Sequence, residues 1–216
     1  MKKLNILWIG LISVLMTACY DDYEKDYDKS TVYFASQKPL RTLVADTDMS
    51  IKVGVAIGGK REVHTDDWAT FEIDPSLLDG TGLTLMPENY YQLADPNKMT
   101  ISNPNLAIAD VKVTFSDAFY NDDAALDKYY AIPFRLVDHN QDEVSTDVNG
   151  NLKDYSIVVV KFVSQYHGTY FVKGKVTNLS TQQVTEYNNK DLSQNMTRDF
   201  VSLGRNKVRR PGFGQT

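Results

Sequence analysis

Cysteine and histidine, which supply the thiol nucleophile and the imidazole base of many enzymes, are scarce in this sequence of 216 residues, whereas carboxylates are so abundant that no pair of them by itself indicates glycoside hydrolysis. It has one cysteine, Cys19, and its three histidines, His64, His139 and His167, lie in segments that we interpret as loops, none beside a plausible nucleophile. The Gly-x-Ser-x-Gly, Gly-x-x-x-x-Gly-Lys and His-Glu-x-x-His motifs of hydrolases, phosphate-binding loops and zinc enzymes are missing from the sequence. We therefore expect a protein that is not an enzyme and that has no cofactor.

Acidic segments offer candidate metal ligands, but their spacing does not fit a known loop. Residues 138–143 alternate oxygen-bearing side chains as a calcium-binding loop does, yet Glu143 stands sixth, where such a loop needs glycine, and Asn149 stands twelfth, where it needs glutamate. We interpret residues 138–154 as a long hydrophilic hairpin loop, and the aspartates at 122, 123 and 127 as a solvated turn. The sequence predicts no metal site.

Aromatic side chains are the remaining candidates for a binding site, because sugar rings stack on exposed tryptophan and tyrosine faces. Trp68 is the only tryptophan beyond residue 18, and it follows a polar loop. Tyr91 and Tyr129 each stand beside another tyrosine, and neighbouring side chains on a strand point to opposite faces, so one ring of each pair faces outward. Trp68, Tyr91 and Tyr129 are the predicted glycan-binding residues, with packing over the core as the alternative for Trp68.

The first 19 residues have the features of a secretory signal peptide. Lys2 and Lys3 precede an apolar run at 4–16, which is followed by small residues and Cys19. The run is too short for a comfortable transmembrane helix. Residues 15–19, Leu-Met-Thr-Ala-Cys, resemble a bacterial lipobox, so we expect cleavage after residue 18 and acylation of Cys19. The alternative is an ordinary signal peptide with a chance cysteine.

Residues 19–29 are rich in acids and tyrosines and have no apolar periodicity, which is typical of a solvated tether. Asp21, Asp22 and Glu24 follow the predicted acylated cysteine directly. Their placement resembles the export signal that sends Bacteroidetes lipoproteins to the outer face of the outer membrane. We therefore expect a lipid-anchored protein that faces the cell exterior, with a plain charged linker as the alternative.

Charge is unevenly distributed along the chain. Residues 19–163 hold 13 Lys and Arg against 25 Asp and Glu, whereas residues 164–216 hold 8 against 3. This shift favours a domain boundary near residue 164. The sequence lacks basic clusters interleaved with aromatic residues before its last quarter, so we do not expect a nucleic-acid partner.

Hydrophobic periodicity indicates strands. Apolar residues alternate with period two at 51–57, 111–115 and 132–136, and residues 155–163 are apolar on both faces, as in a central strand. Further strands are expected to begin near residues 31, 68, 83, 98 and 130, with one helical turn at 74–78. The fold class is predicted to be all-β, with an immunoglobulin-like β-sandwich at 30–164.

Four of these segments, at 53–59, 85–91, 112–115 and 129–136, resemble successive strands of an N-terminal immunoglobulin-like domain found in Bacteroidetes surface lipoproteins. The resemblance covers about residues 28–164. Its most specific parts are residues 87–91 and 130–136. That family is of unknown function and occurs in Sus-type polysaccharide-utilisation gene clusters. Residues 165–216 resemble the opening of a second β-domain, and they are too few to form an independently stable one.

The sequence and the resemblance together predict a non-catalytic lipoprotein on the outer-membrane surface that assists glycan capture. Its expected partners are the membrane, through the lipid anchor, a polysaccharide and an outer-membrane importer complex. The alternative is a structural spacer or an adhesin-like module that binds another protein. Outward aromatic side chains gathered on one face would favour glycan binding, and an unpaired strand edge would favour protein binding.

Overall fold

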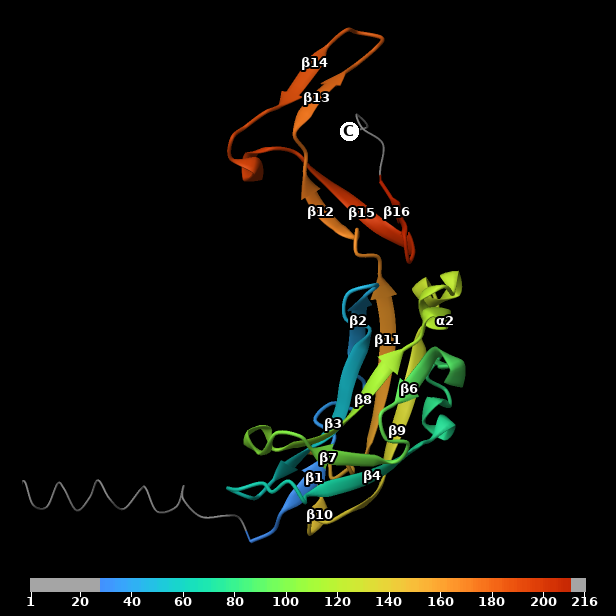
Figure 1. Ribbon diagram of the computed structural model, residues 1–216, viewed down its shortest axis with the longest axis vertical. Helices are drawn as coiled ribbons and strands as arrows, with labels where there is room; N and C mark the ends of the chain where they lie inside the picture. The colour runs from blue at the N-terminus through green and yellow to red at the C-terminus, as the bar shows by residue number, and fades with distance from the viewer. Residues whose placement is uncertain (1–27, 211–216) are drawn as a thin grey trace, which may run out of the picture.

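The computed structural model describes residues 28–210 and shows a β-rich molecule with two parts (Figure 1). Strands β1 to β11 form a curled sandwich, and β12 to β16 form small sheets at one end of it. The strands of the sandwich are β1 (Thr31–Tyr33), β2 (Leu40–Val44), β3 (Ser50–Gly58), β4 (Trp68–Ile73), β5 (Thr84–Leu85), β6 (Tyr91–Leu93), β7 (Lys98–Ile101), β8 (Ile108–Phe115), β9 (Tyr130–His139), β10 (Glu143–Val144) and β11 (Tyr155–Val163).

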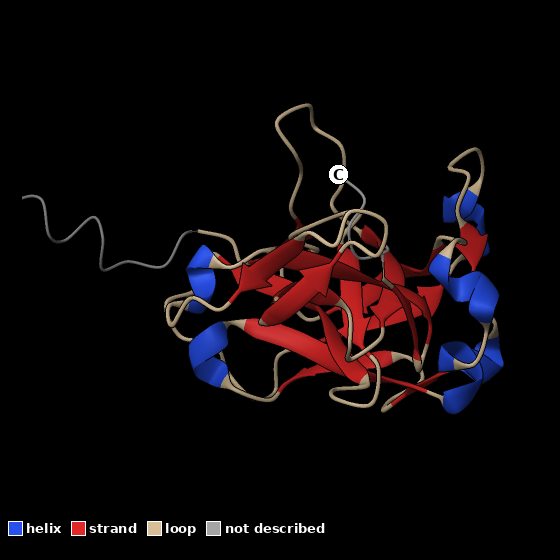
Figure 2. Ribbon diagram, turned by 90° about the horizontal axis from the view of Figure 1, so that it is seen from above, coloured by secondary structure: helices blue, strands red, loops and turns tan. Residues whose placement is uncertain are grey.

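The helices of the described chain are single turns that lie at the periphery of the strands (Figure 2). They are the 3₁₀ helices η1 (Pro75–Leu78), η2 (Glu88–Tyr90), η3 (Pro104–Leu106), η4 (Asp123–Leu126) and η5 (Leu192–Gln194), and the α-helix α2 (Asp117–Tyr120). Among residues 28–210, no helix is both long enough and apolar enough to cross a membrane.

One continuous hydrogen-bonded path makes up the sandwich, in the order β10-β1-β3-β8-β7-β4-β9-β11-β2. Strand β7 pairs with β8 on one side and with β4 on the other, so it joins the two halves of the curled sheet. Strands β5 and β6 pair outside this path with β9 and β8. The all-β, sandwich-like fold expected from the alternating pattern is confirmed.

The core lies between the two halves, where the apolar members of each alternating strand meet. Val53, Val55 and Ile57 of β3 are buried, and so are Phe134 of β9 and Phe162 of β11. Each fully buried side chain of this size contributes on the order of 1.5–3 kcal/mol relative to exposure. The period-two pattern therefore identifies the inward face of these strands correctly.

An aromatic cluster closes the end of the sandwich that lies toward the small sheets. Phe115, Phe119, Tyr120 and Phe162 pack with neighbouring ring centroids 5.2–5.5 Å apart. Two of these rings come from the short segment around α2, which the sequence pattern did not indicate as helical. The cluster anchors this segment to the sheet, because tilted and edge-on aromatic pairs add to the stabilisation from burial.

Strands β3 and β8 approach each other unusually closely at Gly54. A β-carbon built there would lie 2.3 Å from the backbone oxygen of Ala109, which no real side chain tolerates. Gly54 pairs directly with Asp110 in the antiparallel register. This position therefore requires glycine for the pairing of the two strands.

The eight strands expected from the sequence near 31, 51, 68, 83, 98, 111, 130 and 155 are present, each beginning within about three residues of its expected start, and η1 is the expected helical turn at 74–78. Strands β2, β6 and β10 were not expected. The segment interpreted as a hairpin loop, 138–154, holds the end of β9 and the short strand β10, which pairs with β1. His139 thus ends a strand instead of lying in a loop.

The second part contains β12 (Gly168–Phe171), β13 (Gly174–Thr177), β14 (Val184–Tyr187), β15 (Thr197–Gly204) and β16 (Lys207–Arg209). Strands β13 and β14 pair with each other as a hairpin. The segment at Tyr170 and Phe171 does not join it and pairs with β15 instead. None of the apolar side chains among residues 165–210 is fully buried, so this part has no closed core.

Arg205, in the turn between β15 and β16, connects the two parts. Its Nε donates to Oδ1 of Asp46 at 3.0 Å and its Nη1 donates to Oδ1 of Asp117 at 2.8 Å. The backbone N–H of Ser164 also donates to Oγ of Ser202 at 2.9 Å. These bonds fix the small sheet against the end of the sandwich that the aromatic cluster closes.

Candidate functional site

The most distinct aromatic site on the sandwich surrounds Tyr91. The 3₁₀ helix η2 turns the chain so that Tyr90 and Tyr91 point to opposite sides. The Tyr90 ring packs against Phe119 and Tyr130 in the core, with centroid distances of 5.9 and 5.6 Å. Tyr91 begins β6, pairs with Phe115 of β8 and remains partly exposed. Both rings pack against the core, and Tyr91 also lines hollows at the surface.

Tyr91 lies between two adjoining hollows, which we call together the Tyr91 groove. The first, of about 380 Å³, is lined mostly by apolar residues, whereas polar residues outnumber apolar ones around the second, of about 250 Å³. Both hollows share Tyr91 and Glu88. The first is otherwise lined by Ile73, Pro75, Leu85, Met86, Leu93 and Pro96, and the second by Asn89, Gln92, Thr114, Phe115 and Ser116.

The groove offers a ligand both hydrogen-bond donors and hydrogen-bond acceptors. Burial raises the pKa of Tyr91, and the nearby Glu88 carboxylate raises it further. The phenol therefore stays protonated at neutral pH and can donate a hydrogen bond, while Glu88 can accept one. The side-chain amides of Asn89 and Gln92 add both donors and acceptors. An apolar ring flanked by a carboxylate and amides is the arrangement that binds a sugar.

Trp68 lies at the start of β4 and is half-buried. The ammonium of Lys98 stands 5.4 Å from the centroid of its ring, so a cation already occupies the space near that ring. Its neighbour Asp67 is the buried residue of the pair: it accepts hydrogen bonds from Lys60, His64 and Gln141. The hydrogen-bonded loop holds Trp68 at the surface, but Trp68 lines none of the hollows described in this section.

Tyr129 is 52% exposed, and Tyr130 beside it is buried, as strand alternation predicts. The ammonium of Lys161 lies 3.9 Å from the Tyr129 ring centroid, which is close enough for a strong cation–π contact. Tyr129 lines neither hollow of the Tyr91 groove. The three predicted aromatic residues therefore do not share a site. Of the three, only Tyr91 lines a hollow that polar side chains also line.

Cys19, Asp21, Asp22 and Glu24 lie outside the described residues. Acylation of the cysteine and the export role of the three acids stay predictions.

Carboxyl groups whose pKa is shifted are held in their ionised form. Burial alone would raise the pKa of Asp67 and of Asp122, but hydrogen bonds outweigh it and lower both. Asp122 accepts from the hydroxyls of Tyr90 and Tyr130 at 3.0 and 2.9 Å. Hydrogen bonds from Ser76 and then from Arg135 lower the pKa of Asp74. Within residues 28–210, no three His, Cys, Asp or Glu side chains gather as metal ligands would.

A further hollow, of about 610 Å³, lies on the small sheet of β12, β15 and β16, and sequence reasoning did not find it. Its lining includes Arg198 and Phe200, which alternate along β15 on one face of the sheet. That alternation was readable in the sequence. It was missed because the charged residue at 198 breaks the apolar pattern by which a strand face is recognised.

Comparison with known proteins assigns the sandwich to a family. A family model described as an N-terminal domain matches residues 27–143, which is more than half of the chain. The chain belongs to this family of N-terminal domains, which confirms the resemblance seen in the sequence. None of the curated proteins searched matches it.

Among solved structures, a protein of unknown function from Bacteroides ovatus matches with a TM-score of 0.67 and 22% identity, over 84% of this chain and 67% of that one. At this identity the likeness shows the shared fold alone. An auxiliary nutrient binding protein from Bacteroides thetaiotaomicron matches with a TM-score of 0.48 and 12% identity, over 83% of this chain and 62% of that one.

The EndoBT-3987 structure from Bacteroides thetaiotaomicron, with a Man5GlcNAc product, matches with a TM-score of 0.42 and 20% identity over 65% of this chain and 32% of that one. The likeness to this structure and to the nutrient binding protein is too distant to support a functional argument. The present chain spans from about one third to two thirds of the length of these three solved proteins.

Proposed function

We propose that this chain is a non-catalytic, lipid-anchored protein of the outer-membrane surface that binds a glycan at the Tyr91 groove and assists its capture for an importer complex. The observation that carries the proposal is that Tyr91 and Glu88 line two adjoining hollows, one lined mostly by apolar residues and the other with more polar than apolar residues. A sugar presents an apolar ring face and a rim of hydroxyl groups. The two hollows offer a complementary surface for each.

The carboxyl groups support binding over glycoside hydrolysis. A glycosidase needs one carboxyl group with a raised pKa as its general acid and a second, ionised one nearby. In the described chain the shifted carboxyl groups all have a lowered pKa; they are Asp46, Asp67, Asp74, Asp122, Asp142, Asp147 and Asp191. Their partners are ammonium, guanidinium, hydroxyl, side-chain amide and backbone N–H groups. These acids serve as structural anchors of turns and ion pairs.

Glycan binding is tested with the full chain, purified in detergent, on an array of neutral and acidic polysaccharides. Replacement Tyr91→Ala removes the stacking ring and is expected to weaken binding at least tenfold, which corresponds to about 1.4 kcal/mol. Tyr129→Ala is the matched control, since Tyr129 is an exposed tyrosine outside the groove. Equal binding by both variants, or a loss seen only in Trp68→Ala, would refute the Tyr91 groove as the site.

Lipid anchoring is tested by Cys19→Ala. The variant lacks the only thiol of the chain, so it is expected to appear in the soluble fraction of cells from which the original protein sediments with membranes. Surface exposure is then measured by protease treatment of intact cells, comparing the original protein with a variant in which Asp21, Asp22 and Glu24 are replaced by Asn, Asn and Gln. Sedimentation of Cys19→Ala with membranes contradicts the anchor.

A spacer role is the second candidate, and the shape of the molecule favours it. The sandwich and the small sheets are stacked along the longest axis, with β1 toward one end and the β13–β14 hairpin toward the other (Figure 1). In a lipid-anchored spacer, a fluorophore at residue 180, in the turn between β13 and β14, transfers little energy to a dye in the membrane, while one at residue 28 transfers much. Similar transfer from both positions would mean that the molecule lies flat and would exclude this role.

A further inference from the structure

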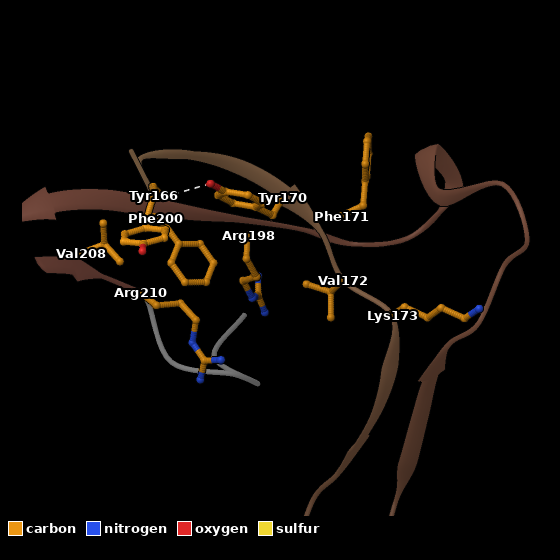
Figure 3. Close-up of a pocket in the computed structure, with 9 residues that line it drawn as sticks. All are labelled: Tyr166, Tyr170, Phe171, Val172, Lys173, Arg198, Phe200, Val208 and Arg210. Atoms are coloured by element: carbon orange, nitrogen blue, oxygen red, sulfur yellow. Dashed lines mark hydrogen bonds between the residues drawn. The ribbon is translucent and has the colours of Figure 1, made fainter. Parts of the chain in front are cut away.

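The hollow on the small sheet is built by strand register, and we call it the β15 groove (Figure 3). Tyr170 of β12 pairs with Arg198 of β15, and Val208 of β16 pairs with Ser202 of β15. Paired residues share a face, so these side chains lie on one side of the sheet with Phe200. The complete lining is Tyr166, Tyr170, Phe171, Val172, Lys173, Arg198, Phe200, Val208 and Arg210.

Aromatic rings form one wall of the β15 groove. The rings of Tyr170 and Phe200 meet edge to face, with centroids 5.2 Å apart, and the Tyr170 hydroxyl donates to the backbone oxygen of Tyr166 at 3.2 Å. Gly168 stands opposite Phe200 in the register and places no side chain beside that ring. The Tyr170 ring remains 45% exposed. An apolar ring face is therefore held in a fixed orientation and is open to a ligand.

Arg198 supplies an unsatisfied donor in the same place. Its side chain projects into the hollow between the aromatic rings and Val172, whereas Phe171 and Lys173 project away from it (Figure 3). The Nε of Arg198 is buried and has no hydrogen-bond partner among the described residues. Leaving such a donor unpaired is unfavourable, because a charged group has lost its hydration without gaining a partner. A ligand that brings an anionic oxygen recovers this cost.

The charge of the lining points to the same ligand chemistry. Arg198, Arg210 and Lys173 are its ionisable groups apart from the two tyrosines, and it contains no acidic residue. Residues 164–216 carry 8 basic against 3 acidic residues, in contrast to the acidic sandwich. Two copies joined through this face would bring like charges together, which disfavours self-association as the reason for the exposed rings.

We propose that the β15 groove binds an acidic saccharide, with a sugar ring on Tyr170 and a carboxylate or sulfate oxygen accepting from Arg198. Its volume of about 610 Å³ lies within the usual range of small-molecule sites. The proposal rests on the proposed function in one respect, that the chain binds glycans. It names a second site and the class of sugar that this site selects.

Two probes test the ligand chemistry by calorimetry on the full chain: a galacturonic acid tetrasaccharide and a sulfated heparin tetrasaccharide. The methyl ester of the first, which has the same rings without the charge, is the neutral comparison. The acidic probe is expected to bind at least tenfold more tightly than the ester, with an affinity that falls as salt is raised. Tighter binding of the heparin probe, which carries sulfates as well as carboxylates, indicates that sulfate contributes, and tighter binding of the galacturonic acid probe indicates that a carboxylate is sufficient.

The site is tested by Arg198→Gln, which keeps the size and polarity of the side chain but removes its charge. Binding of the preferred acidic probe is expected to fall at least tenfold. Arg209→Gln is the matched control, because it removes the same charge from the adjoining strand, where Arg209 pairs with Val201 on the other face of the sheet. Circular dichroism and the melting temperature check that both variants fold like the original chain.

Three results would overturn the proposal: equal binding of the acidic probes and the ester, equal losses in Arg198→Gln and Arg209→Gln, or a dimer in solution that Arg198→Gln disrupts. The last would show that a second copy covers the face. Tyr91→Ala separates this proposal from the proposed function. If the β15 groove is wrong but the proposed function is right, glycan binding is lost with Tyr91→Ala and unchanged with Arg198→Gln.

Discussion

Two buried tyrosines differ in whether the hydroxyl group has a hydrogen-bond partner, and this determines how costly its burial is. Tyr130 donates its hydroxyl to Asp122, and burial together with this bond raises its pKa to about 12. The Tyr120 hydroxyl is buried in the aromatic cluster and has no hydrogen-bond partner within residues 28–210. Burial raises the pKa of Tyr120 as well, so its phenol stays neutral. One hydroxyl is satisfied and the other is not.

The replacements Tyr120→Phe and Tyr130→Phe are therefore expected to have opposite effects on the free energy of unfolding. Removing the unpaired hydroxyl of Tyr120 leaves the ring packing intact and raises stability by about 1 kcal/mol. Removing the hydroxyl of Tyr130 deprives an ionised carboxylate of a donor and lowers stability by about 1.5 kcal/mol. Urea denaturation followed by circular dichroism measures both, and equal shifts would contradict this account.

At the scale of elements, the pairing of β3 with β8 depends on a glycine. A methyl group at residue 54 would push the two strands apart at Ala109, because the obstacle is backbone and not a side chain that could rotate away. Seven residue pairs hold these strands together on both sides of that point. The strain would therefore fall on the centre of the ladder.

Gly54→Ala is expected to lower the free energy of unfolding by about 2–3 kcal/mol, at the upper end of the cost of overpacking a well-ordered interior. Lys112→Ala is a suitable control, since Lys112 is an exposed residue of β8 two positions from Asp110. Thermal melting of the two variants gives the comparison. A Gly54→Ala protein as stable as the control would mean that the strands separate here at little cost.

Much of the sandwich was predictable because most of its strands show a recognisable apolar pattern within their own residues. Residues 51–57 and 132–136 alternate or concentrate apolar side chains, and the structure buries them as expected. Strand β2 was not predictable: four of its five residues are exposed, and it forms because β11 offers a parallel edge. The same reasoning applies to Tyr91, whose place beside Gln92 and Thr114 depends on the pairing of β6 with β8. Contacts between distant segments leave no local pattern in the sequence.

At the scale of the whole molecule, Arg205 determines how rigidly the two parts are connected. Its guanidinium binds both Asp46, in the turn after β2, and Asp117, in α2. The hydrogen bond from Arg205 lowers the pKa of Asp46, and the two acids raise the pKa of Arg205. The connection thus consists mainly of side-chain bonds between charged groups, and the guanidinium also lies 5.8 Å from the centroid of the Tyr120 ring.

Arg205→Ala is expected to widen the distribution of distances between the two parts, measured by single-molecule fluorescence transfer between dyes at residues 38 and 190. The sandwich itself should keep its melting temperature, since Arg205 lies outside the core. Arg209→Ala serves as the control. A narrow distribution in Arg205→Ala would show that the hydrogen bond from the Ser164 N–H to the Ser202 hydroxyl is sufficient to hold the small sheet.

Lowering the pH is expected to widen the distance distribution between the two parts, as Arg205→Ala does. The folded pKa of Asp46 lies below that of an unfolded aspartate, about 3.9. Its stabilising contribution is therefore complete above that value and is lost as the pH falls through the folded pKa. The distance distribution should stay narrow from pH 7 to pH 5 and widen below about pH 4. A distribution that widens already near pH 6 would indicate that another group controls the connection.

The course of β11 has a mechanical consequence. This strand runs along the long axis between β9 and β2 and continues directly toward β12 (Figure 1). A pulling force on the C-terminal end is therefore directed along β11, so its hydrogen bonds to both neighbours are loaded in shear and must break together. The β13–β14 hairpin, paired only with itself, can be unzipped one bond at a time. Under tension the small sheets should extend first, at low force, while the sandwich remains folded.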